Sequence, residues 1–162
     1  MKLFGIIGFP LVHSYSSNYF NNKFKAERIK AKYVNFPITK IDDISELIKT
    51  CPDLHGLNVT MPYKEKIIPF LDEISGEVEK TGAANVIKIV RKNQTIKLIG
   101  YNSDISGFVN SLKPLLSSKH KKALILGTGG AAKAVAYGLS LLDIEYRFVS
   151  RFLSEKFYFL ML

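Results

Sequence analysis

The chain has 162 residues, 47% of them hydrophobic and 23% charged, a composition typical of a soluble globular protein with one ordinary domain or two small ones. Its apolar runs are all shorter than the roughly 20 residues that cross a bilayer, which argues against a membrane protein. The formal net charge is +9, but the lysines are scattered and no zinc-ligand set or aromatic RNA-binding signature accompanies them, so we expect anionic small molecules rather than nucleic acid as ligands.

The N-terminus and the single cysteine favour a cytoplasmic protein. The segment MKLFGIIGFP has one lysine and a short apolar run but no small-residue cleavage site, so it predicts a first strand rather than a signal peptide. Cys51 has no second cysteine with which to form an internal disulfide, which fits a reducing compartment.

Strand-like apolar runs alternate with helical patterns along the first two thirds of the chain. Strands are expected at 3–8, 32–38, 54–60, 84–90 and 95–101, and helices at 16–29, 42–51, 64–72 and 104–116. The polar RKNQ between the last two strands predicts a hairpin. This order predicts an α/β fold with a largely parallel sheet.

The segment GLNVTMPYKEK, residues 56–66, gathers polar groups where a strand ends. Asn58 and Thr60 alternate along the strand, so their side chains leave the same face. Pro62 stops the strand, because it lacks an N–H, and Lys64 follows it. Ligands bind at this end of the strands in open α/β folds. The alternative is a strand edge, a turn and a solvated lysine.

A second unit is expected after a boundary within 103–121. A buried strand at 123–126, a small-residue helix at 130–142 and a strand at 146–150 surround a glycine turn. Gly127, Gly129 and Ala132 match the G-x-G-x-x-G/A dinucleotide fingerprint in its strand–turn–helix context. The alternative is a tight turn that only packs the helix on the strand.

The residues after the second of these strands favour NADP over NAD. Ser150 and Arg151 stand where an NAD-binding domain has an acid for the ribose 2′-hydroxyl, and an arginine there accommodates a 2′-phosphate. The alternative is an exposed arginine at the end of a strand.

Stretches in the same order are similar to segments of the shikimate dehydrogenase family. They read GFPLVHSYSSNYFNNKF, GLNVTMPYK, TGAANVIK, GYNSDISGF and GTGGAAKAV, and SR at 150–151 resembles the family's N-R-T position. The resemblance covers residues 3 to 151. It implies reversible NADP-dependent reduction of 3-dehydroshikimate to shikimate, a step of aromatic amino acid (chorismate) biosynthesis.

The resemblance also implies a role for each matching residue. Ser14 and Ser16 would bind the substrate carboxylate. Thr60, Asn85 and Asp104 would contact the ring hydroxyls with Asn58 nearby, and Lys64 and Asp104 would form the catalytic pair. The cofactor would be held by Gly127, Gly129, Gly130, Ala131, Ala132, Ser150 and Arg151. Because the substrate-site residues lie at strand ends or in the loops after them, we expect them to converge on one cleft between two lobes.

The chemistry of ketone reduction agrees with the implied pair. A lysine ammonium can give a proton to the developing alkoxide and stabilise its charge, so we expect Lys64 to carry the proton and Asp104 to orient it. The alternatives are a surface ion pair and, for Asp104, a helix N-cap. His13 is expected to be a hydrogen-bonding turn residue.

Several positions depart from the family pattern. Ser17 stands for a proline, Phe20 for a histidine, and Val86 and Ser103 for threonines, which we interpret as variation around a retained site. We expect a substrate-binding domain at 1–102, a connecting helix and linker at 103–120, and an incomplete, Rossmann-type (doubly wound) NADP-binding domain at 121–162.

Three hypotheses follow for function. The first is an NADP-dependent shikimate dehydrogenase. The second is a noncatalytic, C-terminally truncated fragment that keeps only part of the substrate site, and the third is a quinate/shikimate dehydrogenase relative. For the chain as given we expect weak shikimate binding, poor NADP binding and little turnover. The apolar tail FLSEKFYFLML, at 152–162, and an open sheet edge also allow homo-oligomers.

Overall fold

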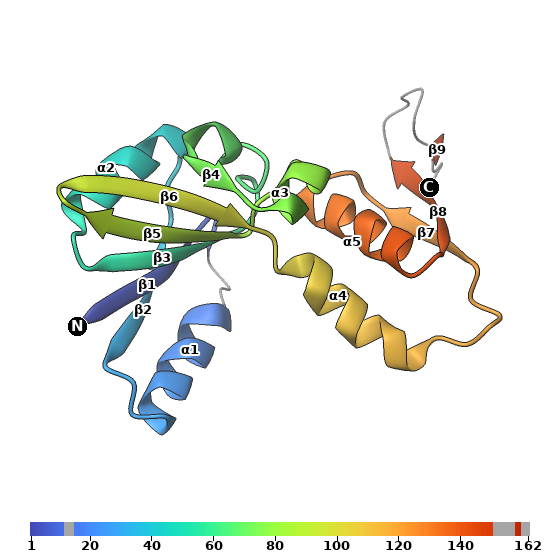
Figure 1. Cartoon of the computed structure of the whole chain (residues 1–162), viewed down its shortest axis with the longest axis horizontal. Coiled ribbons are helices and arrows are strands. Elements are labelled where there is room, and N and C mark those ends of the chain that lie inside the picture. Colours follow the sequence, from blue (N-terminus) through green and yellow to red (C-terminus); the bar gives the residue numbers. More distant parts are fainter. Residues whose placement is uncertain (12–14, 151–157, 160–162) are drawn as a thin grey trace.

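The computed structural model describes residues 1–11, 15–150 and 158–159, which form two β-sheets, each with helices packed on it (Figure 1). The larger sheet has six strands in the order β2-β1-β3-β5-β6-β4. Their bounds are Lys2–Ile7 for β1, Ala31–Phe36 for β2, Leu54–Val59 for β3, Glu73–Ile74 for β4, Val86–Lys92 for β5 and Thr95–Tyr101 for β6.

The larger sheet is mixed. Strand β1 pairs in parallel with both β2 and β3, and β4 pairs in parallel with β6. Strand β5 is antiparallel to β3 and to β6, and the β5–β6 hairpin turns where the sequence predicted it. The α/β class is therefore confirmed, and the parallel pairs lie at the two ends of the strand order, in β2-β1-β3 and in β6-β4.

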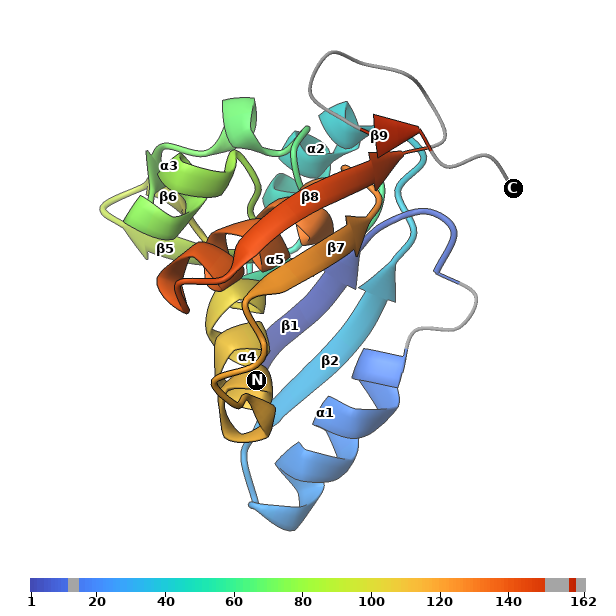
Figure 2. The same cartoon turned by 90° about the vertical axis from the view of Figure 1, so that its right-hand side faces the viewer.

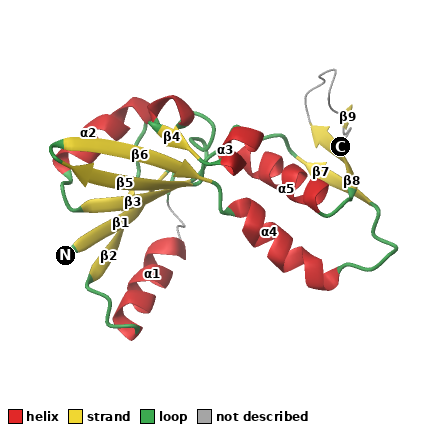
Figure 3. Cartoon of the chain, in the orientation of Figure 1, coloured by secondary structure: helices red, strands yellow, loops and turns green. Residues whose placement is uncertain are grey.

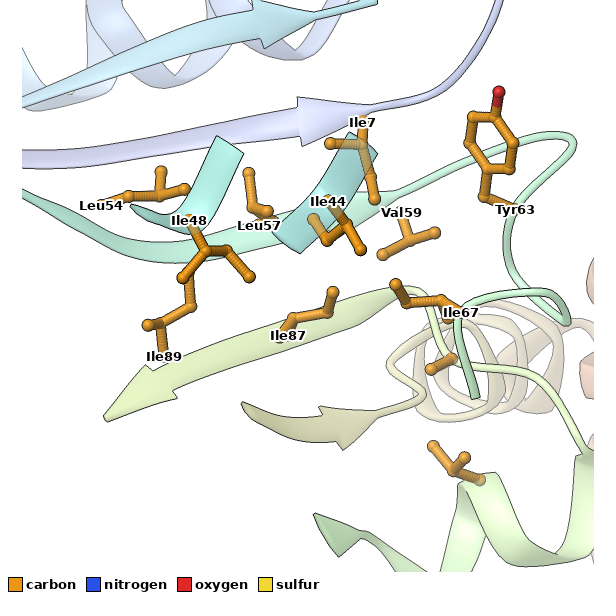
Figure 4. Packing of buried hydrophobic residues seen from close by; sticks show 12 residues of the cluster. Ile7, Ile44, Ile48, Leu54, Leu57, Val59, Tyr63, Ile67, Ile87 and Ile89 are labelled. Atoms are coloured by element: carbon orange, nitrogen blue, oxygen red, sulfur yellow. The ribbon is translucent and has the colours of Figure 1, made fainter. Parts of the chain in front are cut away.

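Helices α1 (Tyr15–Ala26) and α2 (Ile44–Thr50) lie on opposite faces of this sheet (Figures 1 and 3). The core lies on the α2 face, where Leu57 and Val59 of β3 meet Ile7 of β1 and Ile44 of α2 (Figure 4). Because strand side chains alternate between faces, burying Leu57 and Val59 on the α2 side turns Asn58 to the α1 side. The alternation therefore decides which face carries the polar group.

The prediction of a helix at 64–72 is wrong. After one turn at 64–67, the chain forms only a short 3-10 turn at Ile68–Phe70. Pro69 is the physical reason, because proline has no N–H to donate and its ring clashes with the preceding turn of an α-helix. Strand β4 follows instead, and then the short helix α3 (Gly76–Thr81), neither of which the sequence pattern indicated.

The smaller sheet has the order β7-β8-β9, with all pairs parallel (Figure 2). Its strands are β7 (Lys122–Leu126), β8 (Glu145–Ser150) and β9 (Tyr158–Phe159), and α5 (Gly130–Leu141) connects β7 to β8. This is the strand–turn–helix–strand expected around the glycine fingerprint.

Helix α4 (Asp104–Leu112) links the two sheets and packs against α5. Phe108 of α4 joins the cluster around Ile125, Leu139 and Ile144, and a Cβ at Gly138 would lie 2.8 Å from the Phe108 ring. Helix α4 is followed by a 3-10 turn at Lys113–Leu115, in agreement with the expected end near Pro114. The domain boundaries expected at 102 and 120 stay a prediction.

One edge and one face of the smaller sheet are open in the described part of the chain. Strand β7 is an edge strand, and the side chains of Leu124 and Leu126 are 68% and 76% exposed. Within the same described residues, the helices are all too short or too polar to span a bilayer.

Candidate active site

The end of β3 is tied to the start of β5 by backbone hydrogen bonds. The Val59 N–H donates to the Asn85 carbonyl at 2.8 Å, and the Ala84 N–H donates to the Lys64 carbonyl at 2.8 Å. The loop that carries Lys64 is thus held against the segment that carries Asn85. These bonds bring together two side chains that the sequence separates by about twenty positions.

Lys64, Asn85 and Asp104 form one polar cluster. The Lys64 ammonium donates to Oδ2 of Asp104 at 2.6 Å, and the Asn85 amide donates to Oδ1 of the same carboxylate at 2.6 Å. The Lys64 and Asp104 side chains are 20% and 34% exposed, so solvent screens their attraction only in part. Each carboxylate oxygen of Asp104 therefore accepts a hydrogen bond, Oδ2 from the Lys64 ammonium and Oδ1 from the Asn85 amide. The bond to Oδ2 fixes the direction in which the Lys64 side chain points.

Hydrogen bonds anchor the start of α4 to the segment that carries Ala83 and Asn85. The Ser103 N–H donates to Oδ1 of Asn85 at 2.8 Å, and the Asp104 N–H donates to Oδ1 of Asn102 at 3.1 Å. The buried Asn102 amide donates in turn to the Ala83 carbonyl at 2.8 Å. Asn102 and Ser103 were not among the predicted site residues, although the polar run NSD directly after an apolar strand marks the place.

A second polar link leads from Asn85 to α1. The Asn58 amide donates to the Asn85 carbonyl at 3.4 Å, and its Oδ1 accepts a hydrogen bond from the Tyr33 hydroxyl at 2.7 Å. Burial raises the pKa of Tyr33 to about 12, while a hydrogen bond with Ser16 acts in the opposite direction. Asn58 thereby connects Asn85 to Tyr33, a tyrosine that sequence reasoning missed.

Tyr33 predicts a loss of stability in strongly alkaline solution. Its pKa of about 12 in the folded chain lies above the ordinary 10.0, so it stabilises the fold fully below pH 10 and less as the pH rises from 10 towards 12. We expect the free energy of unfolding to fall more steeply over this window in the wild type than in Tyr33→Phe. Urea unfolding at several pH values measures both slopes, and equal slopes would contradict the prediction.

The glycine turn faces Lys64, a member of the polar cluster with Asn85 and Asp104, across a cleft. Residues 127–132 line a cleft of about 470 Å³ whose other wall includes Thr60 and Lys64. The Lys133 ammonium of α5 pairs with the Glu65 carboxylate, which joins the two walls. A Cβ at Gly130 would lie 2.9 Å from the Lys64 Cβ, so the two walls touch at this point.

The same turn has room for a ligand. Gly127 has a φ of +112°, a conformation that favours glycine, and a Cβ placed on Gly127 or Gly129 would meet no atom within 4 Å. Helix α5 starts directly behind, and its N-cap Gly129 has no side chain to cap the free N–H groups. Open space beside uncapped N–H groups suits a pyrophosphate.

We expect substitutions at Gly130 and at its neighbour Gly129 to differ in their effect on the free energy of unfolding. We expect Gly130→Ala to lower the free energy of unfolding by about 1–3 kcal/mol, because its methyl group would overlap Lys64 and Ala83. Gly129→Ser is the matched control and should change that free energy by less than about 0.5 kcal/mol, since its Cβ meets open space and serine is a favourable residue at this N-cap. Urea unfolding of both variants checks this, and equal losses would show that the wall contact is absent.

The structure places most of the predicted site residues but not all of them. Thr60 and Lys64 share the cleft with Gly127, Gly129, Gly130, Ala131 and Ala132, and Lys64 contacts Asp104 directly. Ser150 ends β8. His13, Ser14 and Arg151 lie outside the described residues. In the part of the chain that the structure covers, no group of three His, Cys, Asp or Glu side chains is placed to hold a metal ion.

Comparison with known proteins identifies a family. The family model of the shikimate dehydrogenase substrate binding domain matches residues 6–87. The NADP(+) shikimate dehydrogenase of Dictyoglomus thermophilum is 43% identical over 160 residues, which are 97% of this chain and 54% of that protein.

Two solved structures extend the comparison. Shikimate dehydrogenase 1 from Peptoclostridium difficile has a TM-score of 0.85 and 37% identity, covering 98% of this chain and 59% of that one. The Thermus thermophilus enzyme in complex with NADP(H) and shikimate has a TM-score of 0.77 and 28% identity, covering 93% of this chain and 56% of that one. The chain spans about half the length of the curated relatives it matches.

Proposed function

Because this chain belongs to the shikimate dehydrogenase family, we propose that it binds shikimate and 3-dehydroshikimate and serves their NADP-dependent interconversion. The observation that carries the proposal is that Lys64, which is hydrogen-bonded to Asp104 at 2.6 Å, lines a cleft whose opposite wall is the glycine turn. A proton carrier and a pyrophosphate cradle that face each other are what a hydride transfer to a ketone needs from a protein.

In the direction of reduction, the ketone carbon of 3-dehydroshikimate accepts a hydride and its oxygen accepts a proton. Bound NADPH would supply the hydride and be oxidised to NADP. The Lys64 ammonium gives the proton to the developing alkoxide and stabilises its charge, and the reverse reaction returns the proton to the amine. Asp104 keeps the ammonium in place, since its Oδ2 accepts one of the three ammonium hydrogens.

The remaining polar residues hold the substrate. Asn85 and Thr60 would contact ring hydroxyls beside the catalytic pair, with Asn58 next to them. Ser16, at the start of α1, would hydrogen-bond the carboxylate together with Ser14. The roles of Asn58 and Asn85 are supported by the hydrogen bonds from Tyr33 to Asn58 and from Asn58 to the Asn85 carbonyl, which give this part of the site a fixed polar framework.

The cofactor roles fall to the glycine turn and to the end of β8. Gly129 and Gly130, followed by Ala131 and Ala132, begin α5, whose first backbone N–H groups would bind a pyrophosphate, while Gly127 closes the turn by donating its own N–H to the Val149 carbonyl at 2.9 Å. Ser150 and Arg151 would hold the 2′-phosphate that distinguishes NADP from NAD. The single Cys51 supports a cytoplasmic setting, and the open β7 edge supports homo-oligomers.

A chimera tests the activity. In it this chain replaces the matching 160 residues of the Dictyoglomus thermophilum relative, and formation of NADPH from NADP is followed with shikimate in excess. We expect turnover with shikimate and NADP, and a much lower kcat/KM with NAD. A folded chimera that oxidises quinate in preference to shikimate would favour the quinate dehydrogenase alternative, and one that oxidises neither would contradict the proposal.

A further inference from the structure

We propose that Tyr33 is a positioning residue for the substrate, which acts through the amide of Asn58. This inference rests on the proposed function, because Asn58 belongs to the substrate site assigned above. Its basis is the 2.7 Å hydrogen bond from the Tyr33 hydroxyl to Oδ1 of Asn58. Tyr33 itself is 4% exposed and lies on β2, two strands away from β3 in the sheet.

Tyr33 is fixed on every side. The Asn21 side chain of α1 forms two hydrogen bonds of 2.9 Å with the Tyr33 backbone, one to its carbonyl and one from its N–H. The Phe20 ring stacks on the tyrosine ring with 4.8 Å between the ring centroids. The hydroxyl is therefore held at a set place by α1 and β2 before any ligand binds.

The direction of the hydrogen bonds follows from chemistry. Since an amide oxygen can only accept, the single Tyr33 proton goes to Oδ1 of Asn58, and the bond with Ser16 uses a lone pair of the tyrosine oxygen. With its oxygen held by Tyr33, the Asn58 amide turns its NH₂ group towards the Asn85 carbonyl, 3.4 Å away. One N–H of that group remains as a donor for a substrate oxygen.

Without the Tyr33 hydroxyl, only the long 3.4 Å hydrogen bond to the Asn85 carbonyl still distinguishes the two ends of the Asn58 amide. The amide can then flip more readily, and its flipped orientation would present an oxygen to a substrate oxygen. A fixed donor would become a mixture of donor and acceptor. We expect this to weaken substrate binding while the backbone around it stays in place.

Tyr63 offers a matched control. It is also a buried tyrosine, 3% exposed, and its hydroxyl donates one hydrogen bond of 2.9 Å to the Ile38 carbonyl. Tyr33→Phe and Tyr63→Phe each remove one buried hydroxyl, so both should lower stability in urea by similar amounts. Of the two hydroxyl groups, only that of Tyr33 is hydrogen-bonded to a residue of the proposed substrate site.

The test is shikimate binding by the full chain, measured by isothermal titration calorimetry. We expect Tyr33→Phe to raise the dissociation constant about tenfold and Tyr63→Phe to change it less than about twofold. In an Asn58→Ala background, adding Tyr33→Phe should raise the dissociation constant less than about twofold, because the amide through which Tyr33 acts is already absent.

The possible outcomes separately test the role of Tyr33, its action through Asn58, and the proposed function. Equal affinity losses in the two tyrosine variants, or wild-type affinity in Tyr33→Phe, would overturn the role of Tyr33 and leave the proposed function intact. A full tenfold loss in the Asn58→Ala background would overturn the route through Asn58. A folded wild-type chain that binds no shikimate would overturn the proposed function itself and this inference with it.

Discussion

Replacing Lys64 with methionine is expected to lower kcat for shikimate oxidation by about 10²–10⁴-fold, the range that a positioned general acid or base contributes. Methionine keeps much of the length of the side chain but can neither carry a proton nor stabilise an alkoxide. Because these effects belong to the transition state, KM should change far less than kcat. A loss in kcat with little change in KM identifies a proton carrier, whereas the loss of a binding residue would mainly raise KM.

The measurement uses the chimera with the Dictyoglomus thermophilum relative, since this chain spans about half the length of that protein. Lys66→Met is the matched control, because Lys66 is an exposed lysine of the same loop, two positions further along the chain. It should keep kcat within about twofold. Equal losses in both variants, or a rise in KM that accounts for the whole effect of Lys64→Met, would contradict the assigned role.

Replacing Asp104 with alanine is expected to lower kcat about 10²-fold, the size of effect that follows a misplacement of about 1 Å in a catalytic group. The carboxylate accepts hydrogen bonds from both Lys64 and Asn85 at 2.6 Å, so its removal releases two side chains at once. The ammonium remains charged but is no longer held in one direction. We therefore expect a smaller loss than for Lys64→Met.

The steady-state assay of the same chimera checks this value. Asp42→Ala, which removes an exposed carboxylate far along the chain from the site, serves as the control and should leave kcat unchanged. Asp104→Asn should recover part of the activity, because an amide oxygen still accepts one of the two hydrogen bonds. If Asp104→Ala kept kcat within about threefold, Asp104 and Lys64 would be an ordinary surface ion pair.

The alternation of residues explains how much of the fold the sequence predicted. Leu57 and Val59 alternate with Asn58, and this period of two correctly separates the core face of β3 from its polar face. The helix expected at 64–72 failed because its apolar spacing was read without the effect of Pro69 in its middle. The alternation of residues predicts which face of a strand is buried. A single proline can prevent a helix that the apolar spacing predicts.

The site was harder to predict than the fold, because its contacts join distant parts of the chain. Lys64 and Asp104 are forty positions apart, and only the family resemblance brought them together before the structure. Tyr33 gave no signal at all, since one tyrosine on an edge strand is typical of core packing. Its link to Asn58 depends on the strand order β2-β1-β3, which no local pattern specifies.

The most direct test of the account is a titration of the ¹⁵N-labelled chain with shikimate, followed through the side-chain amide resonances of Asn58 and Asn85. The account predicts that both resonances shift with one common dissociation constant, and that the backbone resonance of Gly130, which packs on Lys64, shifts with them. The same titration of the Lys64→Met variant should still shift Asn58 and Asn85, because the lysine acts mainly on the transition state. Shifts confined to residues away from the site, such as Ser140 and Asp143 beside β7, would contradict the claim that Lys64, Asn85 and Asp104 form the substrate site.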